Sequence, residues 1–300
     1  MKEAYFKRVD LLLSVLPDVM EDPRLALKGG TAINLFVFDM PRLSVDIDLA
    51  YVPLEDRFTA LEAIDTIFEQ IKDVLTAQGL SVTPKFTADN HAKQLIVMDQ
   101  GELIKIEINH ILRGCAYPPV TQALCPKAKD QFKKFMRIQC LAENDLFAGK
   151  ICAALDRQHP RDLYDMHFFL ESKTYTRELH NAFLIYLISN NRPISELIRP
   201  NQQDISHLYT NEFKGMTELD MSLEDLSKAF LRVVDLISFS MTVEDKEFLL
   251  SFKAGMPKWK LMPFEHIQNF PAVKWKLHNI SKMEPEKRRE MLARLERKLS

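Results

Sequence analysis

The chain has 300 residues, of which 46% are hydrophobic and 27% charged, and this ordinary composition excludes a disordered or fibrous protein. No run approaches the roughly 18 uninterrupted apolar residues of a membrane span, and the short apolar run at 11–13 follows Asp10, so we expect neither a membrane span nor a signal peptide. The four cysteines form no C-x-x-C pair, which favours reduced thiols in the cytoplasm over a zinc site or a disulfide scaffold.

Charge is distributed unevenly along the chain. The sequence has 40 Lys and Arg against 42 Asp and Glu, and the net charge of −2 by itself argues against a nucleic-acid binder. Residues 251–300, however, carry 12 Lys and Arg against 5 Asp and Glu, so residues 1–250 sum to −9. The stretch 118–137 is also basic, with five Lys and Arg against Asp130. The near-neutral total therefore conceals basic segments that phosphates could contact.

The apolar spacing of the N-terminal half predicts alternating helices and strands. It predicts a helix over 4–16, an apolar run over 25–27, a short helix over 31–38, a strand over 45–52 and an amphipathic helix over 61–75. Strands are expected next over 80–86, 94–98 and 103–108, and their polar or Gly-containing turns indicate an antiparallel meander.

The C-terminal half is expected to be helical. From about residue 143 the pattern has helical spacing interrupted by prolines, and it ends in a basic helix that begins near Pro285. The boundary between the halves is expected within the stretch 118–137. We therefore predict an α+β fold with an α/β domain over residues 1–137 and a helical domain over residues 138–300.

A glycine pair followed by two aspartates is the most distinctive segment. The motif Lys28-Gly29-Gly30-Thr31 enters a short helix, where backbone N–H groups can approach a phosphate. Asp46 and Asp48 lie two apart on the expected strand, so their carboxylates share a face and favour a cation such as Mg²⁺ between them. Each half alone is common, as a turn or a solvated strand face. Together, about 15 residues apart and with Arg42 and Ser44 leading in, they favour a nucleotide site.

These segments resemble a known family. Gly29-Gly30-Thr31-Ala32 followed by Arg42-x-Ser44-x-Asp46-Ile47-Asp48-Leu49 is similar to the nucleotidyltransferase signature of the polymerase-beta superfamily, in the form found in the AbiEii/AbiGii toxins of type IV toxin–antitoxin and phage-abortive systems. Lys105-Ile106-Glu107-Ile108 stands where that family has a K-x-D strand. Residues 146–153 resemble its third, helical motif, and Arg161-Asp162-Leu163-Tyr164-Asp165 resembles its D-x-x-D motif. The matches span residues 28–170, and residues 171–300 show none.

The resemblance implies an activity and its partners. It implies a polymerase-beta-like domain with a mixed or antiparallel sheet that transfers a nucleoside monophosphate from an NTP to RNA, with the 3′ end of tRNA as the expected acceptor, so that aminoacylation and growth stop. It also implies a cognate antitoxin and two Mg²⁺ ions, for which Mn²⁺ could substitute, held by Asp46, Asp48 and Glu107. The nucleotide-binding residues implied in this way are Lys28, Gly29, Gly30, Thr31, Arg42, Ser44, Lys105, Arg157 and Arg161.

Glu107 departs from the family pattern, which has Asp at this position. On a strand, Lys105, Glu107 and Asn109 share one face, and the isoleucines between them share the other. Three consecutive polar positions on one face are hard to explain as core. The longer carboxylate could hold a second metal ion or act as a base toward the attacking hydroxyl. An exposed strand face is the alternative.

Lys150 and an acidic pair form a second candidate group. Lys150 has small neighbours on its expected helix and could reach a triphosphate, while a surface lysine is the alternative. Asp162 and Asp165 share a face at the start of the next helix, where they could cap it or pair with Arg157 or Arg161. Such a network can itself orient Lys150. The resemblance implies that Lys150 and both aspartates are catalytic. We do not expect either aspartate to be a metal ligand.

The basic C-terminal region is a candidate RNA-binding surface. Its lysines and arginines alternate with Trp259, Phe264, Phe270 and Trp275, a pattern that suits phosphate contacts and base stacking. A solvated helix face or an antitoxin-binding surface would fit the same pattern. Two other functions also stay open, which are nucleotidyl transfer to a protein side chain or small molecule and a non-catalytic nucleotide-binding role.

Overall fold

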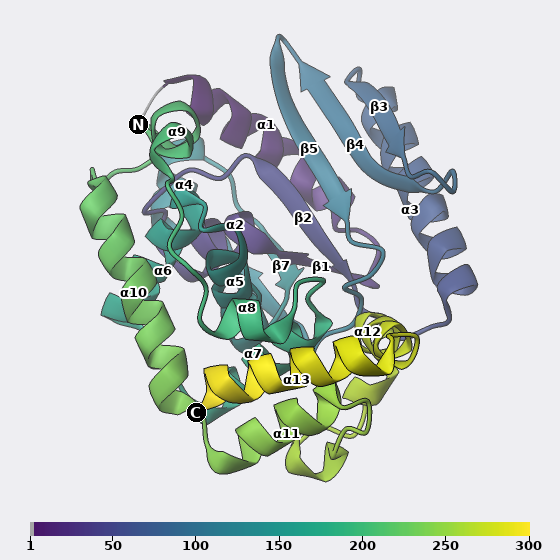
Figure 1. Cartoon of the computed structure of the whole chain (residues 1–300). Coiled ribbons are helices and arrows are strands. Elements are labelled where there is room, and N and C mark those ends of the chain that lie inside the picture. The colour runs from purple at the N-terminus through teal and green to yellow at the C-terminus, as the bar shows by residue number, and fades with distance from the viewer. Residues whose placement is uncertain (1–2) are drawn as a thin grey trace. The chain divides into compact units, whose positions relative to one another are not determined.

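Seven strands form one mixed sheet in the order β3-β4-β5-β2-β1-β7-β6 (Figure 1). The strands are β1 Leu25–Lys28, β2 Asp46–Tyr51, β3 Ser81–Phe86, β4 Ala92–Asp99, β5 Glu102–Ile108, β6 Val120–Ala123 and β7 Arg137–Cys140. The three strands β3, β4 and β5 pair antiparallel, which confirms the predicted meander. β2 runs parallel to β5 and antiparallel to β1, while β7 runs parallel to β1. The α+β fold expected from the sequence is therefore confirmed.

The computed structural model describes residues 3–300, and their packing separates two units. The first unit holds the sheet and comprises the chain up to Leu146 together with Lys214–Asp220. The second unit comprises Phe147–Phe213 and Met221–Ser300 and is made of helices and their connections. Within residues 3–300, no helix has the length and apolar character needed to cross a membrane.

Two helices of the first unit, α1 (Glu3–Val19) and α3 (Arg57–Ala77), pack beside each other and against the sheet (Figure 1). α3 begins where the Asp56 carboxylate accepts hydrogen bonds from the N–H groups of Phe58 and Thr59. Its predicted apolar stripe is buried. The glycine pair opens α2 (Gly29–Ala32), which continues as one π-helical turn, η1 (Ile33–Val37), in place of the single helix that we expected.

The stretch 118–137 contains structure that the sequence did not predict. It holds β6, the helix α4 (Pro126–Phe132) and the start of β7. The Cys125 N–H donates to the Leu35 carbonyl (2.8 Å) and the Lys127 N–H donates to the Asp39 carboxylate (2.9 Å), so α4 is bound to the segment that follows the glycine pair. β7 begins at Arg137, continues beyond the stretch and pairs with β1 in the sheet.

The opposite edge of the sheet is formed by β3, which pairs with β4 alone. This strand contains Pro84, and its register with β4 shifts between Lys85 and Phe86. Its residues are half-buried or exposed, unlike the central strands.

The second unit follows the helical pattern expected from residue 143 onward. Its helices are α5 (Glu143–Arg157, whose first turn belongs to the first unit), α6 (Pro160–Ser172), α7 (Arg177–Ser189), α8 (Ile194–Ile198), α9 (Ser206–Leu208), α10 (Leu223–Ser240), α11 (Val243–Lys253), α12 (Pro271–Ser281) and α13 (Pro285–Leu299). A π turn, η2 (Tyr209–Phe213), and two 3-10 turns, η3 (Trp259–Leu261) and η4 (Ile267–Asn269), connect them. α6 packs on α10, and α13 packs on α8 and α11 (Figure 1).

Asp145 holds the loop that follows β5. Its buried carboxylate accepts hydrogen bonds from the Ala116 N–H (2.7 Å) and the Tyr117 N–H (2.9 Å). Both donors lie in the connection between β5 and β6, outside any strand. The loop therefore depends on one carboxylate for two of its backbone hydrogen bonds.

Replacing Asp145 with Ala should destabilise the first unit, because it leaves the N–H groups of Ala116 and Tyr117 without this acceptor. We expect a loss of about 2–3 kcal/mol in the free energy of unfolding, measured by urea denaturation. Asp73→Ala removes an exposed carboxylate from α3 and should leave the unfolding midpoint unchanged. Equal midpoints for the two variants would contradict the assigned role of Asp145.

Candidate active site

One row of side chains crosses four neighbouring strands of the sheet. The register places Lys28 of β1 beside Asp48 of β2, Asp48 beside Glu107 of β5, and Glu107 beside Gln94 of β4. Residues that lie opposite each other in register project from the same face of a sheet. All four side chains accordingly line one cavity of about 420 Å³. Strand pairing thus brings together residues that are 13 to 79 positions apart in the sequence.

The two strands that carry the carboxylates alternate as predicted. Ile47 and Leu49 are fully buried, whereas Asp46 and Asp48 on the other face stay partly exposed. β5 behaves in the same way, with its isoleucines buried, Glu107 half-buried and Lys105 exposed. Lys105 lies beside Asp46 in the register, one row away from the cavity. The polar positions therefore form a face, which the sequence pattern had indicated.

The glycine pair lies directly against this face. Gly29 has φ +72°, and a Cβ atom there would overlap the Asp48 carboxylate. A Cβ atom on Gly30 would lie 2.6 Å from Nη2 of Arg42 and 2.9 Å from Oγ of Ser44. Both positions therefore need glycine for close approach, and Gly29 needs it for its backbone conformation as well.

Thr31, Arg42 and Ser44 are buried and brace the start of β2. The Thr31 hydroxyl donates to the Asp46 carbonyl (2.5 Å) and lies 3.0 Å from the Ser44 hydroxyl. Arg42 donates from Nη1 to the Leu43 carbonyl (3.0 Å). These contacts hold the backbone that presents Asp46 and Asp48. The motif residues thus have structural partners in addition to the roles that the resemblance implies.

The donor chemistry of the face suits a divalent cation, because carboxylates from adjacent strands line one cavity. In the structure, Glu107 accepts a hydrogen bond from the Gln94 side chain. Across residues 3–300, no three His, Cys, Asp or Glu side chains are gathered in a metal-binding arrangement. A cation bound by Asp46, Asp48 and Glu107 would therefore compete with Gln94 for the Glu107 carboxylate.

Sequence reasoning missed several residues that line this cavity. They include Lys93, Gln94 and His110. The Nε2–H of His110 donates to the Ala92 carbonyl (2.8 Å), and burial lowers the pKa of the imidazole, so His110 is neutral near pH 7. One signal was available, because Asn109 lies two positions after Glu107 on the same face and begins the loop that contains His110.

The second unit gathers Lys150, Asp162 and Asp165. The Lys150 ammonium lies 2.8 Å from Oδ1 of Asp162 and 3.0 Å from Oδ2 of Asp165, and all three side chains are buried. Arg157, whose side chain is 62% exposed, binds Asp162 through Nε at 2.6 Å. Arg161 is half-buried, and its N–H donates to His159 at the start of α6. Lys150 is therefore held by two carboxylates rather than lying on the surface.

The charges around Asp162 fix its ionisation. Burial on its own would raise the pKa of this carboxyl, but Lys150 and Arg157 outweigh burial and hold the pKa well below its ordinary value. Asp162 is therefore ionised at neutral pH, and it keeps the positive charges of Lys150 and Arg157 close to α6.

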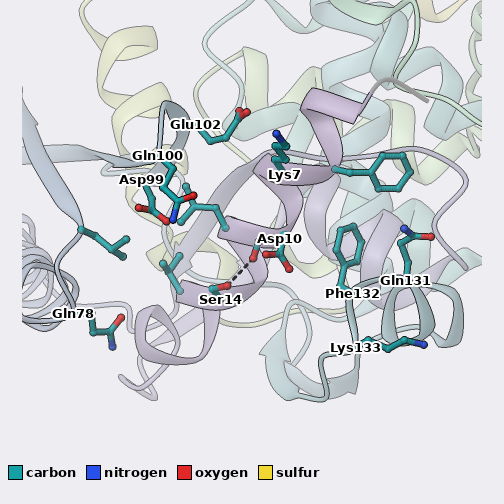
Figure 2. Close-up of a pocket in the computed structure, with 14 residues that line it drawn as sticks. Lys7, Asp10, Ser14, Gln78, Asp99, Gln100, Glu102, Gln131, Phe132 and Lys133 are labelled. Carbon is teal, nitrogen blue, oxygen red and sulfur yellow. Dashed lines mark hydrogen bonds between the residues drawn. The ribbon is translucent and has the colours of Figure 1, made fainter.

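A larger cavity, of about 670 Å³, lies elsewhere in the first unit (Figure 2). It borders α1 and the turn between β4 and β5, and its charged side chains have both signs, including Lys7, Asp10, Asp99 and Glu102. None of the four residues in the row across β1, β2, β5 and β4 lines it. It also lacks the glycine pair and the Arg42 and Ser44 side chains that stand beside the smaller cavity.

The basic C-terminal helix exists as predicted, but part of its charge is used locally. Leu295 and Leu299 of α13 are buried. Arg294 lies 3.5 Å from Glu196, and Lys298 donates to the Arg199 carbonyl. Lys287, Arg289 and Arg297 remain exposed.

Comparison with known proteins identifies the family of the chain. The sequence model of "Nucleotidyl transferase AbiEii toxin, Type IV TA system" matches residues 10–276. The chain belongs to this family. The match includes both the row of the first unit and the Lys150 group, as well as helices in which the sequence alone showed no resemblance. No curated protein matches the chain.

A solved structure supports the fold independently. MenT4, a nucleotidyltransferase toxin from Mycobacterium tuberculosis H37Rv, superposes with a TM-score of 0.57 over 99% of this chain and 92% of its own. The two sequences are 17% identical, so this likeness concerns the fold. The shared fold extends over nearly the whole of this chain.

Gly29→Ala should destabilise this AbiEii protein more than Gly101→Ala. Both positions have positive φ, so each Ala costs about 1–2 kcal/mol of backbone strain. Only the methyl group added at Gly29 would meet the Asp48 carboxylate, since nothing lies within 4 Å of a Cβ on Gly101. Urea denaturation should show a larger loss of unfolding free energy for Gly29→Ala than for Gly101→Ala. In a double-mutant cycle, Asp48→Ala should remove most of this difference. Additive effects of Gly29→Ala and Asp48→Ala would disprove the close approach.

Asp162→Asn should lower the stability of the protein at neutral pH by about 3 kcal/mol, because it leaves Lys150 and Arg157 with less compensating charge. The folded-state pKa of Asp162 lies below 3.8, so its contribution is complete above that pH and declines as the pH falls further. Urea midpoints measured from pH 7 down to about 2.5 should therefore fall less steeply for Asp162→Asn than for the natural protein.

Glu171→Gln is the matched control, since it alters a carboxylate of the same helix, α6, that forms only an exposed ion pair with Arg232 of α10. It should hardly change the midpoint at pH 7. If Asp162→Asn and Glu171→Gln behave alike over the whole pH range, the Lys150–Asp162 pair is not the stabilising contact described above.

Proposed function

We propose that the protein transfers a nucleoside monophosphate from an NTP to RNA, at the 3′ end of tRNA, and thereby stops aminoacylation, translation and growth. The observation that carries this proposal is the row formed by Lys28, Asp48 and Glu107, which lines one cavity beside the glycine pair. Membership of the AbiEii family supports nucleotidyl transfer as the reaction. The choice of tRNA as acceptor rests on the resemblance of the motifs.

The first unit would bind the nucleotide. Gly29 and Gly30 have no side chains that would keep a triphosphate from the backbone, and Lys28 and Lys93 supply positive charge at the same cavity. Thr31, Arg42 and Ser44 would hold this backbone in position through the contacts described above. Lys105, one row away, would contact the nucleotide or its acceptor from the exposed part of the face.

Asp46, Asp48 and Glu107 would hold Mg²⁺, for which Mn²⁺ could substitute, in competition with Gln94 for the Glu107 carboxylate. The bound cations, two in our proposal, would neutralise the charge of the triphosphate and lower the pKa of the acceptor hydroxyl. The acceptor oxygen forms a bond to the α-phosphorus, the bond from that phosphorus to the bridging oxygen breaks, and pyrophosphate leaves. Glu107 would take the hydroxyl proton, because its longer side chain reaches beyond the strand.

The second unit would contribute positively charged side chains, one of which is held by two aspartates. Lys150, Arg157 and Arg161 would contact the nucleotide, while Asp162 and Asp165 hold Lys150 in place. Exposed Lys287, Arg289 and Arg297 of α13 would assist RNA binding. A cognate antitoxin would restrain the activity. We place the protein in the cytoplasm, where NTP and tRNA are available.

Incubating the protein with each labelled NTP, Mg²⁺ and total tRNA tests this function. We expect label on tRNA, and Asp48→Asn should reduce the rate at least about 100-fold because the row loses a carboxylate. Asp99→Asn, in β4 of the same sheet but outside the row, should retain the activity of the natural protein. Label on protein would indicate a different acceptor, and no label on any acceptor would reject the proposed activity.

Glu107→Gln and Glu107→Ala in the same assay test the third carboxylate separately. Both should lower the rate, because neither side chain can bind a cation or take a proton as a carboxylate does. If both variants transfer label as fast as the natural protein, Asp46 and Asp48 act without Glu107.

A further inference from the structure

The basic stretch around α4 forms a surface that the proposed chemistry leaves unused. We call it the α4 patch, and it consists of Lys129, Lys133, Lys134, Phe135 and Arg137. The Phe135 side chain is 82% exposed. A hollow of about 390 Å³ lies beside it, lined by four of these residues together with Pro126 and Asp130. A single exposed apolar side chain is ordinary on a protein surface, so the significance of Phe135 comes from the cations and the hollow beside it.

Phe135 is held in position although its ring is exposed. Lys134, directly before it, pairs with the Asp10 carboxylate (2.5 Å) and donates to the Ser14 hydroxyl (2.8 Å) of α1. The carbonyl of Met136, directly after it, accepts a hydrogen bond from the Leu124 N–H (3.1 Å). The neighbours of Phe135 are thus tied to the protein, by the Lys134 side chain on one side and by the Met136 backbone on the other. Stacking of a ligand on the ring should therefore cost little conformational entropy.

The charge of the α4 patch is not neutralised by the protein. Lys134 is paired with Asp10, but Lys129, Lys133 and Arg137 have no carboxylate partner among residues 3–300. The Lys129 ammonium lies 4.6 Å from the centre of the Phe135 ring. Lys133 extends away from Asp10 and Ser14 beyond the end of α4 (Figure 2). Apart from Asp130, the hollow presents positive charge.

An exposed ring with cations around it matches single-stranded nucleic acid. Every base has a face that stacks on an aromatic side chain, and the phosphates on either side attract Lys and Arg. A folded acidic protein would use the cations but would leave the ring without a matching planar surface. The exposed cations of α13 lack such a ring among their immediate neighbours in that helix, which has no aromatic residue.

The α4 patch is also connected to the glycine-pair segment. The Cys125 and Lys127 N–H groups bind Leu35 and Asp39, which lie in and just after the π turn that continues α2. RNA held at α4 would therefore rest on the structural element that begins at Gly29.

We infer that the α4 patch binds the single-stranded part of the RNA acceptor, with one base stacked on Phe135 and neighbouring phosphates on Lys133 and Arg137. This inference rests on the proposed function for the identity of the acceptor. It adds a binding surface in the first unit, separate from the C-terminal basic helix.

Fluorescence anisotropy with a labelled single-stranded RNA of about 12 nucleotides tests the surface directly. Phe135→Leu removes the stacking ring but keeps an apolar side chain, and it should weaken binding about tenfold. Phe135→Trp should restore the affinity. Phe58→Leu, at another exposed Phe of the first unit, should bind as the natural protein does.

Lys133→Glu tests the phosphate contact. It should lower the slope of log affinity against log salt concentration by about 1, and the φ of +53° at this position is no worse for Glu than for Lys. Lys214→Glu, at an exposed lysine without a partner in the described part of the chain, should leave the slope unchanged. Circular dichroism and urea midpoints equal to those of the natural protein confirm that each variant is folded.

The transfer assay separates this inference from the proposed function. If the natural protein labels RNA, Phe135→Leu should raise the KM for RNA while the affinity for a fluorescent NTP analogue stays the same. If Phe135→Leu changes neither the KM for RNA nor the affinity measured by anisotropy, the inference is overturned and the proposed function stays intact. The same holds if the α4 patch proves to bind an acidic protein instead of RNA. Binding that depends on Phe135 without any transfer would reject the function and retain the surface.

Discussion

The register of β2 between β1 and β5 determines the candidate active site. With this register, Asp48 lies between Lys28 and Glu107, and Ile47 and Leu49 enter the core. A shift by one residue would exchange the two faces of β2, which would bury both aspartates and expose both apolar side chains. Burying ionised carboxylates without partners costs far more free energy than the pairing of one strand provides. The apolar core and the polar row are therefore specified by the same alternation, and neither can change alone.

The sequence predicted those features that depend on local periodicity. The stripe of α3, the meander of β3, β4 and β5, and the faces of β2 and β5 are confirmed because each repeats its pattern over several residues. β6 and β7 were missed since each has four residues and gains its stability from pairing with distant strands. The π turn after α2 was also missed, because apolar spacing over so few residues does not distinguish one helical form from another.

The partners of the site residues were less predictable than the residues themselves. The motif pointed to Asp48, but its closeness to Gly29 depends on the positive φ of that glycine. Gln94 entered the row through the register between β4 and β5; the predicted meander gave the pairing of these strands but not which residues stand opposite each other. The contact between Lys150 and the aspartates of α6 was easier to anticipate, because these residues are close in sequence and on adjacent helices. Prediction thus succeeded for helical neighbours and for the order of the meander strands, and failed for the cross-strand register.

The edge strand β3 affects how the protein behaves at high concentration. An open sheet edge can pair with the edge of another molecule and begin an aggregate. Here Pro84 offers no N–H to an incoming strand, Lys85 places a charge at the edge, and the irregular register near Phe86 bends the strand. These three features prevent strand addition at β3. The sheet can therefore reach seven strands without presenting at β3 an edge that readily adds another chain.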